Sequence, residues 1–275
     1  MPVLPRLAAL ATVLLLLGCS SSEGTDAAPR SATPSATPAA PSAGSTVLAL
    51  GDSVAAGVGA GAPAREGYVP VLAGLLSQRQ GCDDGGAAGC PVEVRNLAVP
   101  GATTTTLLRD QLPSALAALR PAGRVRLVTV TIGGNDVFGP VLQACAQAPG
   151  AAVCVDAVRA ALGGVDEGVD RLLAELSGAG GPGTTVAVMT YYDPLAACRL
   201  APLQPLAEQV LEGADGEDGL NDVLRARAAE HGAVVVETGD RLTAPQDFVG
   251  GLDCLHPSSS GHARIAEAFL DAVAG

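Results

Sequence analysis

The sequence contains no lysine, and all sixteen of its basic residues are arginines. The 28 acidic residues outnumber them, so the formal net charge of the 275-residue chain is −12 at pH 7. A protein that binds nucleic acid needs a basic face for the phosphates, and this composition supplies none. We therefore expect no nucleic-acid partner. An acidic exterior is an ordinary means of keeping an exported protein soluble.

Aromatic residues and long apolar runs are also scarce. Aromatics form 2% of the chain, and tryptophan is absent. Large carbohydrates are commonly held by stacking on aromatic rings, so this composition disfavours a large carbohydrate substrate. No apolar run reaches the roughly 18–20 residues that a membrane-spanning helix needs.

Residues 1–18 are typical of a targeting segment. Arg6 provides a short positive region, and 7–17 is apolar, with the length of a signal-peptide core rather than of a membrane span. The segment runs into LLGCS, which resembles the lipobox of bacterial lipoproteins and implies that Cys19 is lipidated. The alternative is an ordinary cleaved signal peptide with a chance cysteine. Acyl chains on Cys19 would anchor an exported chain on the extracytoplasmic face of the cell membrane.

Residues 19–45 are rich in Ser, Ala, Pro and Thr and show no apolar periodicity, which predicts a flexible tether. Residues 46–275 have the size of one domain. In this part, short apolar runs alternate with helical patterns. The expected strands are Thr46–Leu50, Val92–Leu97, Arg126–Ile132, Thr185–Thr190 and Ala233–Glu237. The expected helices are Val69–Arg79, Thr105–Leu119, Val153–Ser177, Gly219–His231 and Ser259–Ala274.

This alternation predicts an α/β fold, a three-layer α/β/α sandwich around a five-stranded parallel sheet. Ligands bind such sheets at the carboxyl ends of the strands, so the residues that follow each strand are the candidates for a site. The stretch Leu195–Asp218 contains two prolines and a cluster of Gly, Asp and Glu. We expect it to be a loop or a part-helical cover over one end of the sheet.

Six cysteines remain if Cys19 is lipidated, and an even number in an exported chain indicates three disulfides. Fifteen pairings are possible. We favour Cys82–Cys90, Cys145–Cys154 and Cys198–Cys254, because each of the first two pairs would lie within one loop. Six buried free thiols are the alternative. The absence of any C-x-x-C pair disfavours a zinc site, and we expect neither a metal nor an organic cofactor.

Four polar segments occupy the positions that the sheet rule singles out. They are 51–53 (GDS), 96–104 (NLAVPGATT), 133–136 (GGND) and 253–257 (DCLHP), each in a predicted loop at a strand end or before a helix. In this order they resemble the four blocks of the SGNH (GDSL) hydrolases, and the resemblance covers the domain from Thr46 onward. The flanking residues resemble a secreted bacterial lipase-like branch with three disulfides. Val54 departs from the Leu or Ile that is frequent there, at a position that supplies packing.

The resemblance implies a flavodoxin-like SGNH fold and a serine acyl-enzyme mechanism. Ser53 would be the nucleophile, His256 its base, and Asp253 the partner that orients the imidazole. The oxyanion hole would consist of the backbone N–H groups of Ser53 and Gly101 and the side-chain amide of Asn135.

Each of these assignments has a plainer alternative. Ser53 could be a helix N-cap, Gly101 a turn glycine, and Asn135 part of a tight turn. Among the other histidines, His262 is a rival base that we interpret as structural, and we expect His231 to be a solvated residue at a helix end.

Asp52 and Asp136 flank the candidate site residues. We expect both carboxylates to organise loop backbone by hydrogen bonding rather than to take part in chemistry.

We therefore expect a monomeric carboxylic ester hydrolase that acts on a small-molecule or lipid ester. The many Ala, Val and Leu residues around the blocks favour an aliphatic acyl group, hence a lipase or lysophospholipase-like esterase over a carbohydrate O-deacetylase. Acyl transfer to an alcohol and a non-catalytic lipid-anchored binding protein are the alternatives.

Ala55 replaces the second glycine of a G-x-S-x-G elbow, which disfavours the α/β-hydrolase fold.

Overall fold

The structure, a computed structural model, describes residues 45–79, 91–120, 124–145, 151–195, 203–214, 216–251 and 253–274, which lie in one compact unit, 41–275. The predicted targeting segment and the predicted tether up to residue 44 lie outside the described residues, as do Cys19, Cys82, Cys90 and Cys198. No helix within the described ranges is both long enough and apolar enough to span a bilayer.

Five parallel strands form a central sheet in the order β2-β1-β3-β4-β5. They are β1 (Thr46–Gly51), β2 (Glu93–Asn96), β3 (Val125–Thr131), β4 (Thr185–Met189) and β5 (Val234–Val236). All five predicted strands are present. Nearly every residue of β1 and β3 is buried, which explains why their sequences are continuous apolar runs. The strand order is that of flavodoxin-like folds, in which the ligand site lies where β1 and β3 diverge.

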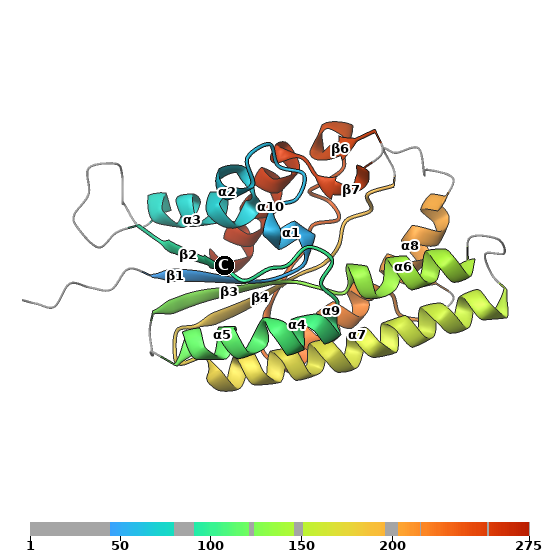
Figure 1. The fold of residues 1–275 in the computed structure, drawn as a ribbon, viewed down its shortest axis with the longest axis horizontal. Coiled ribbons are helices and arrows are strands. Elements are labelled where there is room, and N and C mark those ends of the chain that lie inside the picture. Colours follow the sequence, from blue (N-terminus) through green and yellow to red (C-terminus); the bar gives the residue numbers. More distant parts are fainter. Residues whose placement is uncertain are drawn as a thin grey trace, which may run out of the picture. The chain divides into compact units, whose positions relative to one another are not determined.

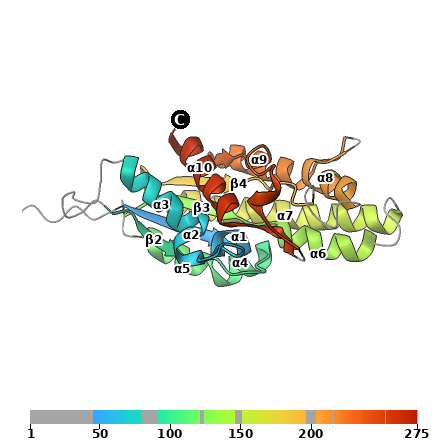
Figure 2. The same ribbon diagram turned by 90° about the horizontal axis from the view of Figure 1, so that it is seen from above.

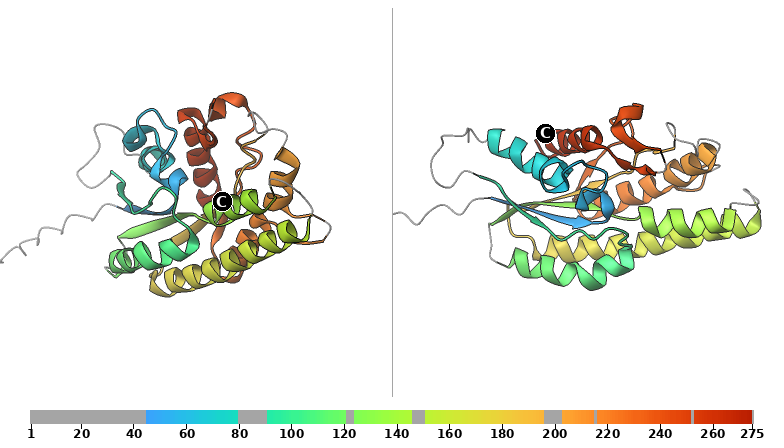
Figure 3. Two further views of the ribbon diagram at one scale, coloured as in Figure 1. Left: turned by 45° about the vertical axis from the view of Figure 1, so that its right-hand side comes forward. Right: turned by 45° about the horizontal axis from the view of Figure 1, so that its top comes forward.

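Helices cover both faces of the sheet, so the predicted three-layer architecture is confirmed (Figure 1). One face has α1 (Ser53–Ala56), α2 (Pro63–Glu66), α3 (Tyr68–Arg79) and α10 (Ser259–Ala274). The other face has α4 (Thr104–Asp110), α5 (Leu112–Leu119), α7 (Ala152–Ala179) and α9 (Leu220–Glu230). The view tilted by 45° shows the same separation of the helices by the sheet (Figure 3), and the view from above shows α3 and α10 lying across the strands (Figure 2). Tyr68 and Phe269 stack with ring centroids 5.0 Å apart and join α3 to α10.

The helix predicted over Thr105–Leu119 is in fact two helices, α4 and α5. Pro113 lies in the first turn of α5, where its missing N–H costs nothing, but it cannot continue a helix that began earlier. Gln111 lies between the two helices, and its side chain exchanges two hydrogen bonds with the backbone of Gly51. The break therefore ties this helical layer to the end of β1.

Helix α8 (Gln204–Glu212) lies within 195–218, which agrees with the part-helical character expected of that segment, and it packs against α9. Two other features differ from the sequence prediction. Helix α6 (Gly134–Cys145) begins inside the segment expected to be a loop. Strands β6 (Phe248–Gly250) and β7 (Asp253–Pro257) form an antiparallel pair, so Asp253 and His256 lie on a short strand rather than in a loop. The residues DCLHP show no strand pattern, and pairing with β6 supplies the extended conformation.

The predicted disulfide between Cys145 and Cys154 is confirmed. It joins the last residue of α6 to the first turn of α7. Cys254 is also disulfide-bonded, but its predicted partner Cys198 lies outside the described residues, so that pairing remains a prediction. The pair Cys82–Cys90 lies wholly outside them.

Candidate functional site

Ser53 lies at the carboxyl edge of the sheet, as the first residue of α1. The preceding Gly51 has a φ of 141°, and a Cβ there would lie 2.2 Å from the carbonyl oxygen of Thr131, so only glycine allows so tight a turn beside β3. Asp52 is the N-cap of α1, and its carboxylate accepts a hydrogen bond of 2.9 Å from the backbone N–H of Val54. The N-cap alternative for Ser53 is therefore wrong.

The structure brings Ser53, His256 and Asp253 together although 203 positions of sequence separate the first two. The Nε2 atom of His256 lies 2.9 Å from Ser53 Oγ. Its Nδ1 atom lies 2.9 and 2.8 Å from the two carboxylate oxygens of Asp253. Because an ionised carboxylate only accepts hydrogen bonds, Nδ1 is the protonated nitrogen. Nε2 of the neutral ring is then free to accept a proton from the serine hydroxyl.

The carboxylate of Asp253 is held ionised by its surroundings. Partial burial alone would raise its pKa, but hydrogen bonds and charge from His256 outweigh this effect and lower the pKa below the ordinary value. Backbone N–H groups of Leu255 and His256 each donate a further bond of 3.2 Å to Asp253 Oδ1. Together these hydrogen-bond donors keep the carboxylate ionised and fix its orientation.

Asn135 lies in the first turn of α6, directly after β3, rather than in an isolated turn. Its side-chain amide donates a 2.9 Å hydrogen bond to the carbonyl oxygen of Ala102. Gly101, with a φ of 79°, occupies a turn closed by a 3.0 Å bond from Ala102 N–H to Val99 oxygen. Gly101 therefore lies in a turn that favours glycine, as the alternative interpretation held. This conformation is compatible with donation of its backbone N–H to an oxyanion. The amide of Asn135 therefore contacts the residue that follows Gly101.

The two flanking aspartates have the structural contacts that the sequence analysis predicted. Asp136 accepts bonds from the backbone N–H and hydroxyl of Thr104, at 3.0 and 2.7 Å, and thereby joins α6 to α4. Asp52 is 2% exposed and accepts hydrogen bonds from the hydroxyls of Thr131 and Tyr191. Burial raises the pKa of Asp52, and the bonds to it act in the opposite direction.

Sequence reasoning missed Tyr191 and Tyr192, which follow β4. Besides the bond from Tyr191 to Asp52, the hydroxyl of Tyr192 donates a 3.1 Å bond to the carbonyl oxygen of Leu255, beside His256. The Tyr192 ring packs against Phe248 of β6. The signal was available, since these tyrosines lie at the carboxyl end of a predicted parallel strand in a chain with only three tyrosines.

A cavity of about 110 Å³ opens beside Ser53. Its lining includes Ser53, Asn135 and His256 from the predicted site, together with Phe138 and Leu255. Gly101 is not part of this lining. The cavity therefore presents the serine hydroxyl, an imidazole and an amide toward one small space.

His262, the rival base, is fully buried on α10, and the hydrogen bonds of its ring are made with backbone groups rather than with Ser53. Its Nδ1 accepts a bond of 3.3 Å from Tyr68 N–H, and its Nε2 donates a 3.0 Å bond to the carbonyl oxygen of Val58. Burial lowers the pKa of His262, which favours the neutral ring. These contacts agree with the structural role that we predicted.

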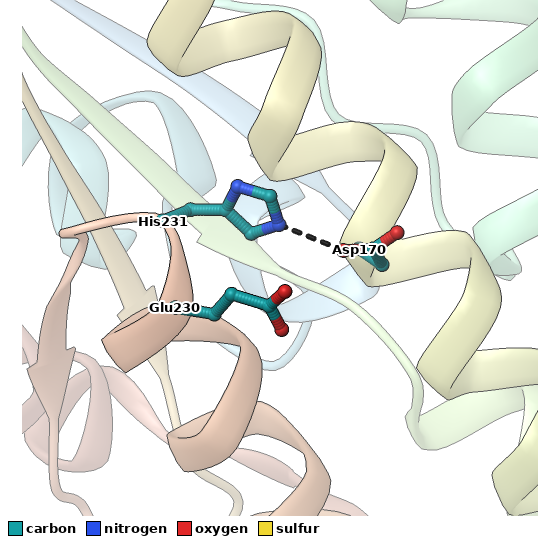
Figure 4. Close-up of side chains that lie close together, drawn as sticks. All are labelled: Asp170, Glu230 and His231. Atoms are coloured by element: carbon teal, nitrogen blue, oxygen red, sulfur yellow. Dashed lines mark hydrogen bonds and ion pairs between the residues drawn. The ribbon is translucent and has the colours of Figure 1, made fainter.

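A second cluster of titratable side chains lies at the other edge of the sheet, where α9 leads into β5. Ligand-type atoms of Asp170, Glu230 and His231 lie within 4.8 Å of one another (Figure 4). His231 is not solvated as predicted, because its Nε2 pairs with Asp170 at 2.8 Å and its side chain is only 17% exposed. Arg227 forms ion pairs of 2.6 Å with Glu230 and 3.6 Å with Asp170. The guanidinium already neutralises these carboxylates, so the cluster is better described as an ion-pair network than as a cation site.

Comparisons with known proteins identify the family and the fold of the chain. Residues 49–264 match the model of the GDSL-like lipase/acylhydrolase family. Among curated proteins, none matches the sequence significantly.

Solved structures with the same fold include an extracellular lipase from Streptomyces rimosus, with 21% identity and a TM-score of 0.58 over 83% of this chain and 99% of that one. Phospholipase A1 from Streptomyces albidoflavus shows 22% identity and a TM-score of 0.54, over 84% of this chain and 100% of its own. The acetylxylan esterase Axe2 from Geobacillus stearothermophilus shows 20% identity and a TM-score of 0.55, over 86% of this chain and 96% of its own.

Proposed function

Because the chain belongs to the GDSL-like lipase/acylhydrolase family, we propose that it hydrolyses carboxylic esters through an acyl-enzyme on Ser53. The observation that supports this proposal most is the 2.9 Å contact between Ser53 Oγ and His256 Nε2, with Asp253 on the opposite nitrogen of the ring. A serine hydroxyl becomes an effective nucleophile when a positioned base accepts its proton.

The proposed reaction proceeds in two halves. Ser53 Oγ attacks the ester carbonyl carbon while His256 Nε2 takes the hydroxyl proton, and the protonated ring then gives that proton to the departing alcohol oxygen. In the second half a water loses a proton to His256 and attacks the acyl-serine. The bond from the acyl carbon to Ser53 Oγ then breaks, His256 returns the proton to Oγ, and the carboxylic acid leaves. Asp253 stabilises the imidazolium in both halves without becoming protonated.

Negative charge develops on the carbonyl oxygen in each half and needs fixed donors. We assign this role to the backbone N–H groups of Ser53 and Gly101 and to the side-chain amide of Asn135. The bond from Asn135 to Ala102 orients the amide, since one N–H is held by the carbonyl and the second is available to the oxyanion.

The proposed substrates are lipid or other aliphatic acyl esters. Apart from the catalytic groups, the cavity at Ser53 is lined by side chains that include Val54, Phe138, Pro194 and Leu255. The LLGCS segment supports a proposal on location: the chain would be exported and held by lipid on Cys19 at the extracytoplasmic face of the membrane. We also propose that the protein is a monomer.

The proposal is tested by labelling the protein with a fluorophosphonate probe and by measuring rates on p-nitrophenyl esters. We expect the probe to modify Ser53 and to abolish hydrolysis, and we expect Ser53→Ala to be neither labelled nor active. A folded wild-type protein that resists the probe and hydrolyses no ester would support a binding protein instead. Rates confined to the acetyl ester would contradict the preference for longer aliphatic chains, and added acceptor alcohols would reveal acyl transfer as a new ester product.

A further inference from the structure

A second, smaller cavity adjoins the one at Ser53. Its volume is about 50 Å³, and the two cavities share Phe138 and Leu255 as lining residues. Phe138 lies about one helical turn after Asn135 on α6, and Leu255 directly precedes His256 on β7. The boundary between the cavities is therefore formed by neighbours of two proposed site residues. The ribbon views place α6 and α8 together beyond the carboxyl edge of the sheet (Figures 1 and 2).

The smaller cavity is apolar throughout. All eight of its lining residues have hydrocarbon side chains, among them Val141, Leu206 and Ala207. None of these side chains can hold an ordered water or a polar ligand group, and a small cavity with such walls favours an alkyl chain. Part of its wall is an apolar cluster separate from the main core, in which Phe138 packs against Leu195, Ala207 and Cys254.

The far wall of the cavity is formed by α8. Ala207 is 3% exposed, and its small side chain leaves space where a longer one would fill the cavity. Leu206 lines this cavity and also a groove of about 480 Å³ that α7, α8 and α9 border. Leu206 thus lies at the boundary between the apolar cavity and the larger groove.

We propose that the apolar cavity receives the distal carbons of the ester's acyl chain, and that Ala207 and Leu206 set the accepted chain length. The chain would leave the acyl carbon at Ser53, pass between Phe138 and Leu255, and end against α8. This inference rests on the proposed function, because it requires an acyl group on Ser53. It narrows the substrate class to esters of aliphatic acids longer than acetate, with an upper limit imposed by Leu206.

The test compares kcat/KM on p-nitrophenyl acetate, butanoate, hexanoate and octanoate. Each methylene that becomes buried should raise kcat/KM about fourfold, which corresponds to ~0.8 kcal/mol, until the cavity is full. For Ala207→Leu, we expect the hexanoate-to-acetate ratio to fall at least tenfold, because the added carbons occupy the cavity. For Leu206→Ala, which removes atoms, we expect the octanoate-to-hexanoate ratio to rise at least threefold.

The matched control is Ala229→Leu, which makes the same change at an exposed position of α9 and should leave every ratio as in the wild type. Acetate hydrolysis by the same sample is the internal reference for each variant, and Leu206→Ala tests the same wall if Ala207→Leu does not fold.

The inference is overturned if both variants change all four rates by one common factor, or if wild-type activity is confined to acetate. A wild-type protein that hydrolyses none of the esters and resists the fluorophosphonate probe instead overturns the proposed function, and the inference fails with it. Changes in the two ratios in the stated directions support the inference.

Discussion

Two Asp–His pairs lie at opposite edges of the sheet and share one contact distance, although His256 pairs through Nδ1 and His231 through Nε2. His256 contacts Asp253 at 2.8 Å at the carboxyl edge, and His231 contacts Asp170 at 2.8 Å at the amino edge. The neighbours of each pair differ. The second ring nitrogen of His256 faces a serine hydroxyl, whereas the His231 pair lies beside Arg227, which forms ion pairs with Asp170 and Glu230.

This difference supports the assignment of the reactive pair in the proposed mechanism to Asp253 and His256. An Asp–His pair can activate a nucleophile only if the free nitrogen faces one and the space beside it can admit a substrate. Ser53 and the cavity of about 110 Å³ meet both conditions at the carboxyl edge. At the amino edge, the guanidinium offsets the carboxylate charge that would stabilise an imidazolium.

The same Asp→Asn substitution, made separately in each pair, tests which of the two Asp–His pairs is needed for catalysis. Asp253→Asn should lower kcat by about 10⁴-fold, as in analogous triads, because an amide can donate to Nδ1 and leave Nε2 in the wrong tautomer. Asp170→Asn should leave kcat within about twofold, since it lies far from Ser53. Steady-state rates on a p-nitrophenyl ester measure both. Comparable losses in the two variants would contradict the assignment of the reactive pair.

The next largest effect is expected at Asn135, whose side-chain amide lies near the His256–Asp253 pair and has no counterpart among the described residues that contact the His231–Asp170 pair. Asn135→Ala should lower kcat by about 10²–10³-fold with a smaller change in KM, because the lost donor serves mainly the charged transition state. The thermal midpoint of the variant checks that the turn at Ala102 survives. A kcat within threefold of the wild type would remove Asn135 from the proposed oxyanion hole.

The Cys145–Cys154 disulfide links α6, which begins next to Ser53, to α7, which includes Asp170. Replacing both cysteines by alanine should lower the free energy of unfolding by about 2–3 kcal/mol, the cost that the chain-entropy model gives for so short a loop. Activity at 25 °C should persist, because the bridge lies at the end of α6 remote from Asn135. Urea unfolding and ester hydrolysis separate the two outcomes, and a loss of activity in a folded variant would contradict this separation.

His262 extends the comparison to a histidine with no carboxylate partner among its hydrogen bonds in the described residues. Its folded-state pKa is lowered, so the unfolded chain takes up a proton at a higher pH than the native protein does. The free energy of unfolding should therefore fall as the pH drops below about 6.5, the unfolded value.

Urea midpoints between pH 7.5 and 5.5 measure this effect. The fall should persist in His231→Gln and shrink in His262→Gln. An equal slope in His262→Gln and the wild type would show that another group is responsible.

The smallest effect is expected at the amino-edge pair itself. His231→Ala should lower the free energy of unfolding by about 0–1 kcal/mol, because the pair is partly solvated and Arg227 still has Asp166 as a partner at 2.6 Å. Esterase activity should not change. A loss above ~2 kcal/mol, or altered ester hydrolysis, would show that this cluster does more than hold α7 to α9.

Much of the architecture could be predicted because strands buried on both faces have continuous apolar sequences. Strands β1, β3 and β4 follow from this property, and the GDS and GGND segments lie at the carboxyl ends of β1 and β3, where a parallel sheet binds ligands. The edge strand β2 is exposed, and the DxxH segment lies on the antiparallel strand β7. Apolar periodicity alone missed the helix break at Gln111, although Pro113 in the first turn of α5 is a sequence signal for it. Only the structure shows that Gln111 hydrogen-bonds to Gly51, 60 positions away.

The chemical groups available at the site can be read from the order of residues: a serine after the first strand, an amide after the third, and an aspartate and histidine near the end. The contact between Ser53 and His256 depends instead on the fold, because the distance between their side chains is set by how β7 pairs with β6 and packs on α10. The apolar cavity also arises from the tertiary structure, since its walls come from α6, α8 and β7. A cavity has no local sequence signature, because it is a space that distant elements leave unfilled.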